Sequence, residues 1–147
     1  MGSIALPSRG RVYADAQILI YSVESHPVFA PLMAPLWQQV QGGALEVVSS
    51  ELSILETLTL PLRANNASLI TAYEQMLTRP GIHLVPITEP ILRAAAKLRA
   101  KSPRLRTPDA IHVATAEDAG CALLLTNDLT LRGVGAIPAA FLNDVVK

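Results

Sequence analysis

The chain has 147 residues, of which 50% are hydrophobic and 16% are charged, and its formal net charge is zero. This length fits one domain with its own core, and the hydrophobic content excludes a disordered chain. The balanced charge excludes a global positive field, so any contact with nucleic acid must come from local clusters. The single cysteine, Cys121, excludes an internal disulfide and fits a reducing compartment.

The sequence also lacks the usual marks of exported and membrane-anchored chains. The amino-terminal stretch has no positive region followed by a long apolar one, so it predicts no signal peptide. Leu6 stands where a myristoylation motif has Ser or Thr. Prolines and polar residues interrupt every apolar run before it reaches membrane-spanning length. We therefore expect a single soluble domain over residues 1–147, located in the cytoplasm.

Short β-rich runs alternate with helical patterns along the chain. Strands are expected at 11–14, 44–49, 82–87 and 121–126, with a weaker one after Gly133. Helices are expected at 16–24, 31–41, 50–62, 66–78, 88–101 and 108–119. This alternation predicts an α/β fold, namely a three-layer α/β/α sandwich with a mainly parallel central sheet. In such sheets, ligands bind beyond the carboxyl ends of the strands.

Three further features have a structural interpretation, and two of them also have a functional one. Residues 26–40 carry three prolines among apolar side chains. They could form a partner-binding edge or a core-packing helix with irregular ends, and the sequence favours neither. His112 lies one turn after Asp109, where it could approach a substrate, but we expect an ordinary helix histidine. Cys121 opens an apolar strand and is expected in the core.

Several acidic residues fall near the expected carboxyl ends of strands. Asp15 interrupts the otherwise apolar run VYADAQILIY, where an unpaired buried carboxylate would be costly. Asp128 follows the fourth strand, within TND. Asp109 falls in the first turn of a helix, with Thr107 expected as its N-cap and Pro108 as its first residue. The carboxyl ends of parallel strands meet at one edge, so these groups are expected to converge.

Each of these residues also has an ordinary explanation. Asp15 could cap a helix, Asp109 could complement a helix dipole and Asp128 could stabilise a turn. Carboxylates that share one site, however, repel each other unless a cation bridges them. Oxygen ligands without clustered cysteine or histidine indicate Mg²⁺ or Mn²⁺ in place of zinc, and such ions suit phosphoryl chemistry.

Periodicity leaves the glutamate of this site open. In a helix that begins near residue 51, the apolar stripe of Leu55, Leu58 and Leu62 centres near Glu51. Glu56 falls to the side of that stripe. By periodicity, Glu51 could therefore be the inward carboxylate.

A basic cluster precedes Asp109. Its members, with no acidic residue among them, are Arg93, Lys97, Arg99, Lys101, Arg104 and Arg106. It is either a solvated helix face or a site for a phosphate backbone, which would have to lie near the proposed metal. Aromatic residues are too scarce for a broad base-stacking platform.

Taken together, the motifs resemble the PIN-domain ribonucleases, and most closely the VapC-type toxins of toxin–antitoxin pairs. The matching segments are VYADAQILIY, SELSILE, DAIHVATA and LLTND. The resemblance implies Mg²⁺- or Mn²⁺-dependent cleavage of RNA, homodimers and a cognate antitoxin. It implies that the catalytic metal ligands are Asp15, Glu56, Asp109 and Asp128. It also implies that Thr126 helps to hold metal or water.

The resemblance bears on the remaining alternatives as well. Its spacing favours Glu56 over Glu51. Two positions depart from the family: Thr130 stands where many relatives have an acidic residue, and Ala16 follows Asp15 where a hydroxyl is common. The basic residues nearest the site are expected to position RNA; they are Arg99, Lys101, Arg104 and Arg106.

Other classes of function compete with the nuclease. A catalytically inactive PIN-like binding module stays open because of Thr130. A phosphoacceptor domain would need an aspartate after its central strand and a late lysine, and IHLVPITEP offers no such aspartate. A phosphatase of the dehalogenase type would need Asp-x-Asp after the first strand, and ADAQ lacks the second aspartate.

Overall fold

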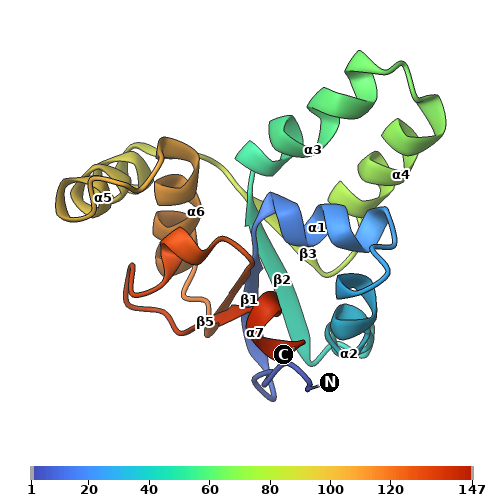
Figure 1. Ribbon diagram of the computed structural model, residues 1–147, viewed down its shortest axis with the longest axis horizontal. Helices are drawn as coiled ribbons and strands as arrows, with labels where there is room; N and C mark the ends of the chain where they lie inside the picture. The colour runs from blue at the N-terminus through green and yellow to red at the C-terminus, as the bar shows by residue number, and fades with distance from the viewer. Residues whose placement is uncertain (1, 147) are drawn as a thin grey trace.

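A parallel sheet of five strands runs through the centre of the computed structural model, which describes residues 2–146 (Figure 1). The strands are β1 (Gly10–Ala14), β2 (Leu45–Ser50), β3 (Ile82–Val85), β4 (Leu123–Thr126) and β5 (Ala139–Phe141). Their spatial order is β3-β2-β1-β4-β5, and every neighbouring pair is parallel. The expected parallel sheet is confirmed, and β5 is the weak strand expected after Gly133.

Helices connect the strands. They are α1 (Ala16–Val23), α2 (Phe29–Gln41), α3 (Leu52–Arg63), α4 (Ala67–Leu77), α5 (Glu89–Lys101), α6 (Thr107–Asp118) and α7 (Leu142–Val145). The first six match the expected helices to within two residues at each end, a common uncertainty of helix boundaries. The short α7 and a 3₁₀ turn, η1 (Leu129–Leu131), were not expected. Gly120 follows α6 with a φ of 66°, as expected for a residue that ends a helix.

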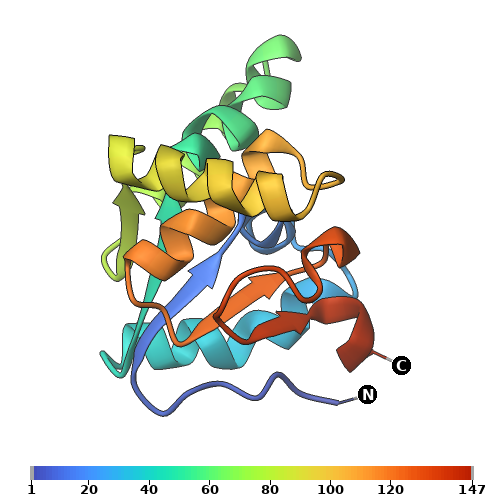
Figure 2. The ribbon, with the colours of Figure 1, turned by 90° about the vertical axis from the view of Figure 1, so that its left-hand side faces the viewer.

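The strand side chains alternate between two cores, one on each face of the sheet. Val12 and Ala14 of β1 pack with α1 and α2, whereas Tyr13 between them packs with α5 and α6. Leu125 and Leu124 of β4 divide between the two faces in the same way. Figure 2 shows α5 and α6 in front of the sheet, and Figure 1 shows α1 and α2 on its other side. The three-layer arrangement is therefore confirmed.

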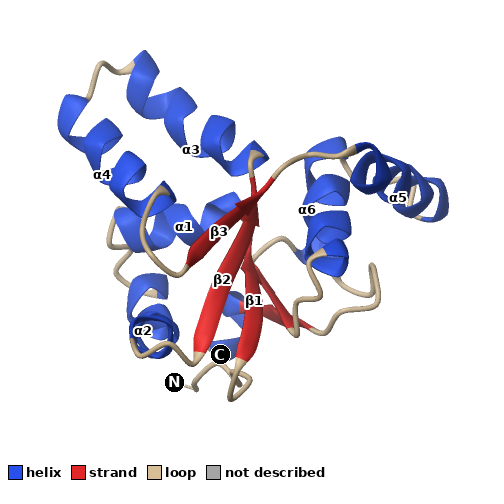
Figure 3. Cartoon of the chain, turned by 180° about the vertical axis from the view of Figure 1, so that it is seen from behind, coloured by secondary structure: helices blue, strands red, loops and turns tan. Residues whose placement is uncertain are grey.

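The pair of helices α3 and α4 extends away from the sheet (Figure 3). The expectation that the apolar stripe of α3 faces the core is wrong for Leu55 and Leu62, which are 65% and 56% exposed. The buried positions of α3 are Ser53, Thr57 and Pro61. The fully buried side chains of α3 are therefore small or hydroxyl-bearing, and of the expected stripe only Leu58 packs against the core.

The segment of residues 26–40 and Cys121 both contribute buried side chains to the interior. On α2, buried Leu32, Met33 and Leu36 join the core, so the core-packing interpretation of residues 26–40 holds. Cys121 is buried, as expected, and burial raises the pKa of its thiol to about 11. Within residues 2–146, no helix combines the length and apolarity needed to cross a membrane.

Candidate active site

A pocket of about 370 Å³ opens at the carboxyl ends of the central strands. Its lining residues are Asp15, Ala16, Gln17, Ile20, Tyr21, Glu56, Arg106, Asp109, His112, Asn127 and Asp128. The acidic ones come from four places: directly after β1, from α3, from the first turn of α6 and shortly after β4. The parallel sheet brings these elements together because the carboxyl ends of its strands share one edge.

Asp15 both caps a helix and lines the pocket. One carboxylate oxygen, Oδ1, accepts a hydrogen bond from the Ile18 amide at 3.2 Å, so Asp15 is the N-cap of α1. The other oxygen, Oδ2, accepts from the Thr126 hydroxyl at 2.6 Å. Burial raises the pKa of Asp15, and the hydrogen bond from Thr126 opposes that rise. The capping role expected for a lone aspartate therefore coexists with a place in the site.

The structure places Glu56, and not Glu51, in the pocket. Glu51 is exposed and precedes α3 without making a side-chain cap. Glu56 lies five residues further along and places Oε1 at 2.6 Å from His112 Nε2. His112 is buried and its Nδ1 lies 2.5 Å from the Tyr13 hydroxyl, which fits the structural role expected for it, although it also lines the pocket.

Asp109 lies in the first turn of α6 and accepts a hydrogen bond from Arg106 Nε at 3.1 Å. Burial raises the pKa of Asp109, the bond from Arg106 lowers it, and the charge of Asp128 raises it again. The expected cap is wrong, because α6 begins at Thr107 and Arg106 occupies the N-cap position without a capping bond. The Thr107 hydroxyl instead accepts from Arg99 Nη1 at 3.0 Å.

Asp128 is held by two hydrogen bonds from Thr130. The Asp128 Oδ1 atom accepts from the Thr130 hydroxyl at 2.7 Å and from its amide at 3.0 Å. Burial alone would raise the pKa of Asp128, but these hydrogen bonds lower it overall. Thr130, which stands where the family that the sequence resembles often has an acidic residue, therefore orients Asp128.

Thr126 ties two of the acidic residues to β4, which leads to a stability prediction. Its hydroxyl donates to buried Asp15 and accepts from the Asp128 amide at 3.0 Å. We expect Thr126→Val, which keeps the branched shape, to lower the free energy of unfolding by about 1–3 kcal/mol, because buried polar partners lose their bonds. Urea unfolding measures this loss. The control Thr59→Val removes an exposed hydroxyl and should cost less than about 0.5 kcal/mol; equal losses would contradict the prediction.

The basic residues expected to contact RNA divide into two groups. Arg99 is engaged with the protein, since its Nε donates to the Leu105 carbonyl at 2.9 Å and its Nη1 to Thr107. Lys101 is exposed at the end of α5, Arg104 is exposed in the loop that follows it, and Arg106 is exposed at the rim of the pocket. The geometry thus brings only Arg106 of this cluster into the pocket lining.

Sequence reasoning missed three polar residues of the pocket. Gln17 and Tyr21 line it from α1, and Asn127 lines it from the loop after β4. The Asn127 amide donates to the Tyr21 hydroxyl at 3.3 Å, which links the two sides of the pocket. Asn127 stands inside the TND motif, which was a usable signal; Gln17 and Tyr21 lie on a helix whose apolar pattern concealed them.

The donor chemistry of this pocket fits a hard divalent cation. It offers four carboxyl groups, with Arg106 as the cationic side chain among its described lining residues. Oxygen-rich sets of this kind suit Mg²⁺ or Mn²⁺. Within residues 2–146, however, no three His, Cys, Asp or Glu side chains are grouped so that they could hold an ion as they stand. Ion binding would therefore require side-chain rotation.

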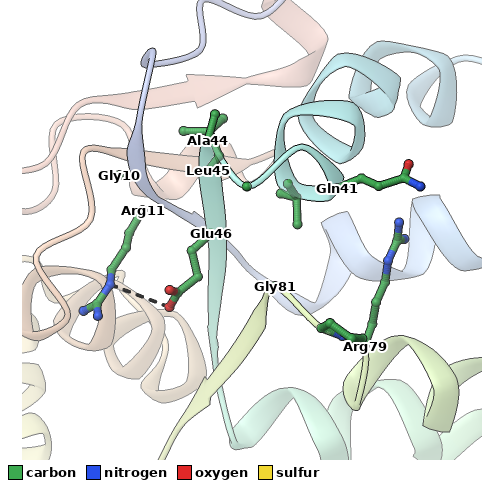
Figure 4. A pocket seen from close by; sticks show the side chains of 11 residues that line it. Gly10, Arg11, Gln41, Ala44, Leu45, Glu46, Arg79 and Gly81 are labelled. Atoms are coloured by element: carbon green, nitrogen blue, oxygen red, sulfur yellow. Dashed lines mark ion pairs between the residues drawn. The ribbon is translucent and has the colours of Figure 1, made fainter.

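A larger hollow, of about 680 Å³, lies at the opposite edge of the sheet (Figure 4). Its charged groups are already engaged. Arg11 lies 3.7 Å from Glu46 and donates to the Ala119 carbonyl at 3.0 Å. Arg79 lies over the Trp37 ring, 5.3 Å from its centroid. This hollow is at the amino ends of the strands, away from the acidic residues, and we assign it no chemistry.

Comparisons with known proteins agree with this geometry. The family model of the PIN domain matches residues 12–137. A comparison with curated protein sequences found no match. The chain therefore belongs to the PIN domain family.

Solved structures share the fold at low sequence identity. VapBC2 from Rickettsia felis, bound to a promoter DNA fragment, has a TM-score of 0.70 at 10% identity, covering 88% of this chain and 98% of that one. DNA-bound VapBC from Salmonella typhimurium has a TM-score of 0.67 at 12% identity, covering 90% and 98%. A toxin–antitoxin complex from Klebsiella pneumoniae has a TM-score of 0.64 at 20% identity, covering 89% and 97%.

Proposed function

We propose that this PIN-domain chain is a Mg²⁺- or Mn²⁺-dependent endoribonuclease and the toxin of a cytoplasmic toxin–antitoxin system. One observation carries the proposal: four carboxyl groups from four separate elements line a single pocket at the carboxyl edge of a parallel sheet. Each group alone has a structural explanation, but the four together have a shared chemical use. Their mutual repulsion is a cost that a bound cation would remove.

The proposed ligands of one or two divalent ions are Asp15, Glu56, Asp109 and Asp128. A bound ion of this type supplies a water of lowered pKa and neutralises charge on the phosphodiester. The protein keeps Asp15 in place through Thr126 and Asp128 in place through Thr130. Asp109 would have to exchange its contact with Arg106 for the ion, which would leave the Arg106 guanidinium available to a phosphate oxygen.

Exposed basic residues next to the pocket would position the RNA backbone. Arg106 lies at the rim, and Lys101 and Arg104 are exposed on the segment that leads to it. Arg99 would act by holding the turn at Leu105 and by supporting Thr107. Cationic groups in this place would contact phosphates without reading the base sequence.

The proposed partners are an antitoxin and a second copy of the chain. The similar structures include a toxin–antitoxin complex from Klebsiella pneumoniae and two DNA-bound VapBC structures, which supports an antitoxin partner. On α3, Leu55, Leu60 and Leu62 are 65%, 68% and 56% exposed, which is unusual for large apolar side chains grouped on one helix. Such a surface supports association with another protein chain.

The test measures metal binding and RNA cleavage on the same protein. We expect the wild type to bind Mn²⁺ in a calorimetric titration and to cleave RNA in a reaction that EDTA stops and Mn²⁺ restores. Asp15→Asn should weaken Mn²⁺ binding, because it removes a charged ligand. The matched control Glu51→Gln removes one negative charge outside the pocket and should bind Mn²⁺ like the wild type. A folded wild type that neither binds Mn²⁺ nor cleaves RNA would favour the inactive binding module.

A further inference from the structure

We propose that His112 is a positioning residue that holds the Glu56 carboxylate in the pocket and thereby strengthens divalent-ion binding. This inference rests on the proposed nuclease function and concerns one ligand of that same site. His112 is not itself offered as a metal ligand or as a group that touches RNA. Its proposed effect passes through Glu56.

The imidazole of His112 joins three elements of the fold. His112 stands on α6 and is only 3% exposed. On one side, its Nδ1 lies 2.5 Å from the hydroxyl of Tyr13, which is fully buried on β1. On the other side, its Nε2 lies 2.6 Å from Glu56 Oε1 on α3. A buried chain of polar groups therefore runs from the central strand to a carboxylate at the pocket.

The protons in this chain can be assigned from the partners. An ionised Glu56 only accepts hydrogen bonds, so His112 Nε2 must carry the proton between them. In the neutral imidazole, Nδ1 is then an acceptor and the Tyr13 hydroxyl donates to it. The Tyr13 bond thus fixes both the ring orientation and the tautomer that faces Glu56.

Glu56 needs such support more than the other acidic residues do. Asp15, Asp109 and Asp128 have shorter side chains and are held by Thr126, Arg106 and Thr130, respectively. Glu56 has one more rotatable bond and projects from α3, which extends away from the sheet. Ordering a longer side chain costs more conformational entropy, and a fixed hydrogen bond from His112 meets that cost before the ion binds.

The decisive comparison uses two amides of different reach. The side-chain nitrogen of Gln can take the place of Nε2, so His112→Gln retains a donor to Glu56. The nitrogen of Asn stands near Nδ1, so His112→Asn keeps a polar group beside Tyr13 but cannot reach Glu56. The matched control Thr115→Val removes a buried hydroxyl of α6 that bonds only the Ile111 carbonyl in the described contacts.

Two measurements provide the readouts. One is a calorimetric titration with Mn²⁺ alone, and the other is single-turnover cleavage of an RNA that the wild-type protein cleaves. We expect His112→Asn to weaken Mn²⁺ binding about 10-fold to 100-fold and to slow the cleavage step, with the KM for RNA unchanged. His112→Gln should recover most of the Mn²⁺ affinity, and Thr115→Val should match the wild type. If His112 only fills the core, His112→Asn would lower the melting temperature without changing the Mn²⁺ affinity, and that result would overturn the proposal.

A double-mutant cycle separates this inference from the function on which it rests. In a Glu56→Ala background, His112→Asn should cause no further loss of Mn²⁺ affinity, because its effect passes through Glu56. Additive losses would overturn the positioning role. If His112→Asn does not fold, Tyr13→Phe replaces it: unchanged Mn²⁺ affinity there would overturn the proposal, and weaker binding would support it. A wild type without Mn²⁺ binding or cleavage would overturn the nuclease function itself, and this inference with it.

Discussion

Replacement of Asp109 by Asn is expected to lower the rate of RNA cleavage by about 10³-fold or more while leaving the domain folded. The change keeps the size of the side chain and removes the charge that would hold the ion. Divalent ions contribute several kcal/mol of transition-state stabilisation, and each 1.4 kcal/mol corresponds to about tenfold in rate. Single-turnover cleavage with saturating Mn²⁺ measures the loss.

The same substitution should change stability in a pH-dependent way. The pKa of Asp109 is raised by burial, so the folded protein favours the protonated form over the carboxylate. That contribution to stability is present at low pH and is lost as the pH rises through the folded-state pKa. Asp109→Asn cannot ionise. Its melting temperature should therefore exceed that of the wild type by more at pH 7 than near pH 4, about where a free aspartate titrates.

Asp118→Asn is the matched control for both measurements. Asp118 lies at the other end of α6, is exposed and does not line the pocket. It should cleave RNA at the wild-type rate. If Asp109→Asn fails to fold, that result would support the structural explanation, in which Asp109 stabilises the first turn of α6. Retained cleavage in folded Asp109→Asn would contradict its role as a ligand.

Leu125→Ala is expected to give the largest loss of stability, about 2–5 kcal/mol in the free energy of unfolding. Leu125 is fully buried on β4, pairs with Ala14 and Ala140 in the sheet and belongs to the core under α1 and α2. Truncation removes apolar contacts and leaves a cavity that rigid strands cannot close. Urea unfolding followed by the fluorescence of Trp37, the single tryptophan, measures the change.

Leu60→Ala is the control for this loss. Leu60 is 68% exposed on α3, so its truncation should change the free energy of unfolding by less than about 0.5 kcal/mol. The slope of stability against urea should be similar in both variants, because the surface exposed on unfolding hardly changes. Comparable destabilisation by the two substitutions would contradict the burial pattern.

The alternation of apolar runs was enough to predict the architecture. The strand segments are short and apolar, and their neighbours follow helical periodicity, so local patterns place six helices and four strands to within a few residues, whereas the fifth strand was expected only somewhere after Gly133. The carboxyl-edge rule then indicated where Asp15 and Asp128 would lie, because both follow strands directly. Fine detail at Thr107 was wrong, since a long-range bond from Arg99 competes for the hydroxyl that was expected to cap α6.

Contacts between distant segments decided the rest. Hydrophobic periodicity favoured Glu51, but α3 extends away from the sheet and exposes Leu55 and Leu62. Two of its three fully buried positions, Ser53 and Thr57, carry hydroxyl groups, which hydrophobic periodicity does not detect. That orientation brings Glu56 to His112, 56 residues away, and His112 to Tyr13, 99 residues away.

The sequence by itself thus determined the class of fold and the strand ends at which carboxylates gather. These follow from local spacing, because side-chain direction repeats every two residues in a strand and every 3.6 in a helix. The spacing shared with the family already favoured Glu56 over Glu51, but only the tertiary structure decided which buried groups hold Glu56. Those pairings depend on how α3 and α6 pack against the sheet, and no short stretch of sequence contains that information.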